Sequence, residues 1–126
     1  MYPLPPKDEL SHLVGSELTE VIIDPYGVRF LLSGPGVNAG ITVESPFLYR
    51  ESDTEDRFEP DQGCSTQPPV RFHALLRQRL TALDVTQEGD RLSLQFEGGQ
   101  ELTIWSEIGG PYESGSINDD GKQWIF

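Results

Sequence analysis

The stretch from Leu80 to Trp105, LTALDVTQEGDRLSLQFEGGQELTIW, decides the fold. Its middle part, residues 91–97, alternates apolar and polar side chains, which is typical of a strand with one buried and one solvated face. The two glycines at 98–99 indicate a hairpin turn, because glycine readily adopts positive φ. The stretch therefore predicts a three-stranded antiparallel meander, with strands at about 80–86, 91–97 and 100–105.

The same pattern occurs earlier in the chain, which predicts a duplicated fold. A shift of 62 positions brings Leu18 onto Leu80, and the apolar residues and turn glycines of 18–36 then fall on those of 80–98. Self-similarity of this kind indicates repeated structural units. We expect two pseudo-symmetric halves, with internal repeats at about 13–46 and 75–107.

Shorter signals complete the predicted architecture. Prolines precede two candidate short helices at 7–14 and 70–78. The acidic segment at about 50–69 is interpreted as a linker between the repeats, and residues 112–126 as a C-terminal hairpin. We predict one domain over residues 1–126, mainly β, in which two pseudo-symmetric antiparallel β-meanders pack as a sandwich or partly open barrel with one or two short helices.

Alternation also predicts the core. The inward positions are Val21, Ile23, Phe30, Leu32, Ile41 and Val43 in the first half, and Leu83, Val85, Leu92, Leu94, Leu102 and Ile104 in the second. The first meander is apolar on its outer face as well, at Ile22 and Leu31. We expect residues 47–49 of the same chain to cover these two side chains in a monomer, with a homodimer as the alternative.

Composition excludes several classes of partner. The 126 residues include 9 Lys and Arg against 21 Asp and Glu, so the formal charge is -12. This balance argues against nucleic acid, whose phosphates need clustered cations, and against an anionic membrane surface. No apolar run approaches the roughly 20 residues of a membrane span, and the start has no signal-peptide pattern, so we expect a cytoplasmic protein. The single Cys64 allows no intramolecular disulfide and no multi-cysteine zinc site.

Signals for catalysis are weak, so we do not predict an enzyme. Ser114 lacks the first glycine of a nucleophile elbow, and His12 and His73 are too few for a metal centre without further ligands. Glu97 and Glu101 flank a solvated hairpin tip rather than a cleft. We predict no catalytic residue, no metal ligand and no cofactor.

The acidic run from Glu51 to Asp61 is the first candidate binding region. Such a run is usually a solvated linker, but it can also dock a basic protein. The candidate partner-binding residues in it are Asp53, Glu55, Asp56 and Glu59.

Aromatic residues form the second candidate region. By strand alternation Trp105 points away from the main core, and Tyr112 lies near it in sequence. Together they are candidates for a partner-binding surface, because large aromatics dominate many interfaces. The alternative is a second, small hydrophobic cluster formed with Trp124 and Phe126.

The segments LSLQFEGG at 92–99 and Tyr-Glu-Ser at 112–114 are similar to those of a small bacterial family of uncharacterised proteins, a domain of unknown function with duplicated β-meanders. The resemblance covers about residues 13–126 and is best over 76–126. Members often have an aromatic residue after the Tyr-Glu-Ser segment, where this chain has Gly115. The resemblance implies the fold and brings no activity with it.

Two classes of function follow from these features. An acidic domain without catalytic groups suits a protein-interaction module, similar to an immunity protein or inhibitor, that binds a basic protein. The alternative is a small-ligand-binding protein or enzyme with a pocket between the two repeats. We predict the interaction module.

Overall fold

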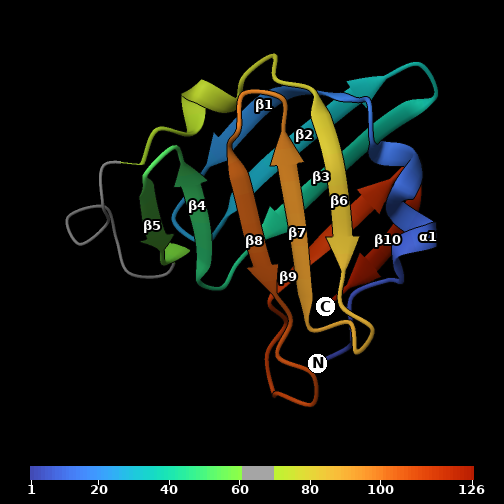
Figure 1. Cartoon of the computed structure of the whole chain (residues 1–126). Coiled ribbons are helices and arrows are strands. Elements are labelled where there is room, and N and C mark those ends of the chain that lie inside the picture. The colour runs from blue at the N-terminus through green and yellow to red at the C-terminus, as the bar shows by residue number, and fades with distance from the viewer. Residues whose placement is uncertain (61–69) are drawn as a thin grey trace.

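The chain folds as a mainly β sandwich, as predicted from the sequence. The computed structural model describes residues 1–60 and 70–126, and these form ten strands in two antiparallel five-stranded sheets (Figure 1). In sheet A the strand order is β1-β2-β3-β9-β10, and in sheet B it is β5-β4-β8-β7-β6.

Sheet A consists of β1 (Glu17–Ile23), β2 (Val28–Gly34), β3 (Val37–Val43), β9 (Gly115–Asp119) and β10 (Lys122–Ile125). Sheet B consists of β4 (Phe47–Glu51), β5 (Thr54–Phe58), β6 (Leu80–Val85), β7 (Arg91–Phe96) and β8 (Glu101–Trp105). The helical segments are α1 (Lys7–Leu10), η1 (Ser11–Leu13) and η4 (Phe72–Leu75).

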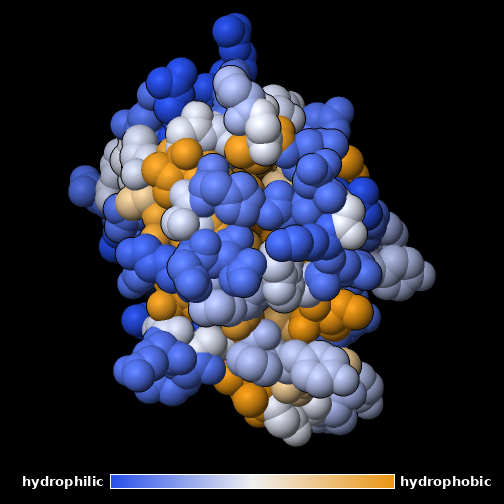
Figure 2. Space-filling model, turned by 90° about the vertical axis from the view of Figure 1, so that its right-hand side faces the viewer, coloured by the Kyte–Doolittle hydropathy of each residue, from blue (hydrophilic) through white to orange (hydrophobic). Residues whose placement is uncertain are grey.

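Both predicted short helices are present, the second as a 3₁₀ turn. The first lies along one side of the sandwich (Figure 1), where Leu10 and Leu13 are buried between the sheets. Figure 2 shows that this side of the molecule is mainly hydrophilic and that apolar side chains reach the surface in separate patches. No helix in the described part of the chain is long and apolar enough to span a membrane.

Each meander is completed by a hairpin from the other half of the chain. Strands β1–β3 and β6–β8 are the two predicted meanders. The β4–β5 hairpin follows β3 in sequence but pairs with β8, and the β9–β10 hairpin follows β8 but pairs with β3 (Figure 1). The two halves therefore exchange hairpins, so each sheet contains strands from both halves.

Two backbone hydrogen bonds join the two meanders reciprocally. The amide of Leu18 donates to the carbonyl oxygen of Gln78 (2.9 Å), and the amide of Leu80 donates to that of Ser16 (2.8 Å). Both bonds obey the shift of 62 positions, because Leu80 corresponds to Leu18 and Gln78 to Ser16. A β-bulge also follows Leu18 in β1 and Leu80 in β6. These backbone features therefore occur at corresponding positions of the two meanders.

The strand registers correct one detail of the repeat. Ile23 pairs with Val28, and Val85 pairs with Leu92, so Val28 corresponds to Leu92, 64 positions later rather than 62. Between these paired residues, the connection from β6 to β7 is two residues longer than the connection from β1 to β2. A difference of two leaves every side chain on its predicted face, because strand alternation has a period of two.

The predicted inward positions are buried in the core, except that Ile23 is exposed and Val21 is only partly buried. Ile23 is 58% exposed because it ends an edge strand, so its predicted burial is wrong. Val21, on the same edge strand, is only partly buried against the core. At the corresponding edge of sheet B, the N-terminal segment packs against the turn between β6 and β7. The amide of Leu4 donates to the carbonyl oxygen of Gly89 (2.8 Å), and Leu4 is buried.

Two further expectations are wrong. Residues 47–49 do not cover Ile22 and Leu31, because they belong to β4 in the opposite sheet, and Ile22 stays 40% exposed. The predicted linker does not extend over residues 50–58, which form the end of β4, a tight turn and β5. Its later part at 61–69, including Cys64, lies outside the described residues.

Candidate functional site

The β4–β5 hairpin holds the predicted acidic residues and divides them between its two faces. Asp56 lies opposite Tyr49, whose ring is buried, so the Asp56 side chain is on the core-facing side of β5. Glu55 is the next residue along the strand and therefore points to the outer face. Asp53 lies at the tip of the turn, and Glu59 follows β5, where Arg57 binds it at 3.0 Å.

A hollow of about 550 Å³ opens at the tip of this hairpin. Its lining residues are Tyr49, Glu51, Ser52, Asp53, Thr54, Asp56 and Arg71. The side-chain carboxylates of Asp53 and Asp56 make no ion pair or hydrogen bond to any other residue that the structure describes. The structure thus brings two of the four predicted acidic residues together and leaves the other two outside the hollow.

The third carboxylate of the hollow is already engaged. The Tyr49 hydroxyl donates to Glu51 Oε2 (2.7 Å), and Arg71 Nη1 lies 2.8 Å from Glu51 Oε1. Burial raises the pKa of the Tyr49 phenol well above its ordinary value, and the hydrogen bond to the Glu51 carboxylate raises it further. This chain of contacts connects the buried aromatic core to the rim of the hollow.

Replacing Tyr49 by Phe is expected to lower the free energy of unfolding by about 1–2 kcal/mol at pH 7, because a hydrogen bond to a charged group is lost. The raised folded-state pKa stabilises the native chain below the ordinary phenol value of 10.0, and this contribution disappears as the pH rises toward the folded value. The difference between native and variant should therefore shrink above about pH 10. Urea denaturation at pH 7 and at alkaline pH measures it, and a constant difference would contradict the assigned contact.

The aromatic candidates do not form one cluster. The alternative prediction, a small hydrophobic cluster of Trp105 and Tyr112 with Trp124 and Phe126, is therefore wrong. Trp105 is half-buried on the outer face of sheet B, beside Arg57 in a hollow of about 230 Å³. Tyr112 is 79% exposed in the loop between β8 and β9. Trp124 packs against the core from β10, and Phe126 is fully buried.

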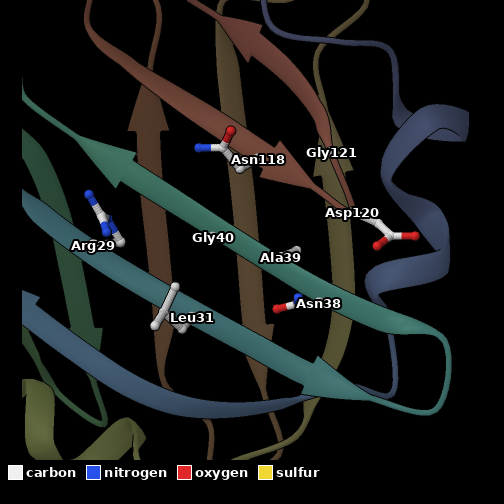
Figure 3. A pocket seen from close by; sticks show the side chains of 8 residues that line it. All are labelled: Arg29, Leu31, Asn38, Ala39, Gly40, Asn118, Asp120 and Gly121. Carbon is white, nitrogen blue, oxygen red and sulfur yellow. The ribbon is translucent and has the colours of Figure 1, made fainter.

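Sequence reasoning missed a third hollow, of about 340 Å³, on the outer face of sheet A (Figure 3). Its lining residues are Arg29, Leu31, Asn38, Ala39, Gly40, Asn118, Asp120 and Gly121. Glycine, asparagine and aspartate usually indicate turns, so the sequence did not suggest that these residues line a hollow. The available signal was that Gly40 directly precedes Ile41, which is one of the predicted inward positions.

Groups suited to catalysis or to metals are few and dispersed. His12 Nε2 lies 2.7 Å from Asp119 Oδ2, and the Ser114 hydroxyl accepts a hydrogen bond from the amide of Glu107 (3.3 Å). Within residues 1–60 and 70–126 no three His, Cys, Asp or Glu side chains are placed to hold a metal ion.

Comparison with known proteins returns no relative. No protein-family model, no curated protein and no solved structure matches this chain. The function is therefore argued from the chemistry of these surfaces.

Proposed function

We propose that this protein is a non-enzymatic interaction module, similar in role to an immunity protein or inhibitor, that binds a basic protein at the tip of the β4–β5 hairpin. One observation carries the proposal: Asp53 and Asp56 line a common hollow, and their carboxylates have no hydrogen-bond or ion-pair partner among the described residues. A Lys or Arg side chain of the partner would pair with both carboxylates. Hydrogen bonds between ionised groups are about twice as strong as neutral ones.

Arg71 supplies an internal example of this contact. Its guanidinium approaches the Glu51 carboxylate, in the same hollow, to 2.8 Å. Among the described residues, the lining of the hollow contains three carboxylates and one guanidinium, so negative charge is in excess there. A second cation, supplied by the partner, would compensate the remaining charge.

The hairpin is also well fixed, which favours binding. Arg50 in β4 forms an ion pair with Glu101 in β8 (2.8 Å), and Tyr49 is buried in the core. The Asp56 carboxylate lies on an anchored strand, so it loses little freedom when a partner binds. The formal charge of -12 would attract a basic protein from a distance and accelerate association.

The test uses three forms of the chain as bait for proteins from the source cells. They are the native chain, the double variant Asp53→Asn/Asp56→Asn and the control Glu55→Gln, which changes an acid on the opposite face of β5. We expect native and control chains to retain the same basic protein. With the double variant, association at low salt should be about tenfold slower or worse, and the native rate should fall as salt rises.

Three outcomes would contradict the proposal. The native chain retains no basic protein, the double variant binds it as fast as the control does, or association does not depend on salt. Loss of binding in Trp105→Ala alone would place the contact on the outer face of sheet B instead.

A further inference from the structure

Gly40 lies at the centre of the hollow on sheet A, and its backbone does not require a glycine. Its φ is outside the left-handed region, and an added Cβ would come close only to the side chains of Leu31 (2.9 Å) and Arg29 (4.0 Å). Glycine weakens the interior of a strand and often marks a place where a ligand approaches the backbone. In the first meander this glycine lies in β3, which is the central strand of the five-stranded sheet A.

The other half of the molecule shows how the same position can be closed. Gly40 pairs with Asn118 in sheet A, and the corresponding pair in sheet B is Glu101 with Arg50. There Arg50 Nη2 lies 2.8 Å from Glu101 Oε2, and Gln95 Nε2 donates to the same oxygen (3.1 Å). Long side chains thus fill the site in sheet B, whereas sheet A leaves it open. The fold itself does not demand an open groove.

The groove is lined by groups that suit a neutral, hydrogen-bonding ligand. The side-chain amides of Asn38 and Asn118 have no hydrogen-bond partner among the residues described, and each side chain offers two donors and an acceptor. Arg29 and Asp120 supply one charge of each sign, so the lining favours neither an anion nor a cation. Figure 3 shows Arg29 and Leu31 on one side of the Gly40 strand and Asn118 on the other.

From these features we infer that the groove over Gly40 binds a neutral carbohydrate. Hydroxyl groups both donate and accept, which matches the two amides and the mixed charges. The methyl groups of Leu31 and the bare backbone of Gly40 offer an apolar surface for the C–H face of a sugar ring. The volume of about 340 Å³ lies at the lower end of the roughly 300–1,000 Å³ usual for ligand sites, so a mono- or disaccharide fits.

This inference goes beyond the proposed function and is independent of it, because the groove lies on sheet A and the acidic hairpin on sheet B. The experiment is a titration of the ¹⁵N-labelled full chain with maltose, lactose, cellobiose and N,N′-diacetylchitobiose, and with sialyllactose as an anionic comparison. We expect at least one neutral disaccharide to shift the backbone signal of Gly40 and the side-chain amide signals of Asn38 and Asn118.

A closing variant provides the decisive comparison. Gly40→Glu/Asn118→Arg copies the Glu101–Arg50 ion pair into sheet A, so it should keep the fold and lower sugar affinity at least about tenfold. Asn38→Ala/Asn118→Ala removes two exposed amides and should weaken binding similarly, even if the closing variant fails to fold. Thr103→Ala, on the outer face of sheet B, is the matched control and should bind as the native chain does.

Each of the following results would overturn the inference. No neutral saccharide shifts the groove signals, sialyllactose binds while the neutral sugars do not, or a folded closing variant binds sugar as tightly as the native chain.

Discussion

Replacing Phe72 by Ala is expected to lower the free energy of unfolding by about 3–5 kcal/mol, which is the usual cost of deleting a buried aromatic ring. Phe72 is only 3% exposed, although it lies in the short η4 segment. Its ring centroid is 5.7 Å from that of Phe30 in sheet A, and 5.7 and 5.3 Å from those of Phe47 and Phe58 in sheet B. One side chain therefore joins both sheets, and its removal leaves a cavity that no single neighbour can fill.

Urea denaturation of the native chain and the variant measures the effect of this change. Leu76→Ala is the control, since Leu76 follows the same segment but is 42% exposed. We expect the control to cost less than about 1 kcal/mol. If Phe72→Ala cost no more than the control, the aromatic cluster would not be a main source of stability.

Replacing Gly115 by Ala is expected to destabilise the fold by about 3 kcal/mol, the upper end for overpacking a well-filled site. An added Cβ would overlap the backbone carbonyl oxygen of Thr42 and lie 2.7 Å from the buried ring of Phe126. The oxygen belongs to β3, to which β9 is paired, so relief requires the two strands to separate locally.

Gly40→Ala is the matched control for Gly115→Ala, because it adds the same methyl group to the adjacent strand. There the new methyl meets the end of the Leu31 side chain, which can rotate away. We expect this control to change the free energy of unfolding by less than about 1 kcal/mol. Equal effects of the two substitutions in thermal and urea denaturation would contradict the packing described around Gly115.

The two meanders could be predicted because their information is local. Leu92, Leu94 and Phe96 alternate with polar residues within a single strand, and the glycines mark where it turns. The hairpin exchange could not be predicted in this way. Tyr49 and Ile117 need only an apolar interior, and either sheet provides one, so their pattern does not reveal which strand they pair with.

The structure of the acidic segment could not be predicted, for a related reason. In β5 the charged residues Glu55 and Arg57 alternate with Asp56 and Phe58, and an edge strand with so many charges resembles a loop in sequence. Only the pairing with β4 shows that Asp56 shares a hollow with Asp53 while Glu55 does not. A sequence gives the charge of a segment but not the face on which each charge lies.

The exchange of hairpins also affects how the chain folds while it is being synthesised. Strand β3 forms its second set of ladder contacts with β9, so the edge of the first meander stays unpaired until residues 115–119 have left the ribosome. Contacts this distant in sequence slow folding, and unpaired strand edges in unfinished chains promote aggregation. The first half alone therefore lacks the neighbouring strands that complete each sheet. Two nascent chains that lie close together on one message could exchange hairpins with each other instead, which would yield an intertwined dimer.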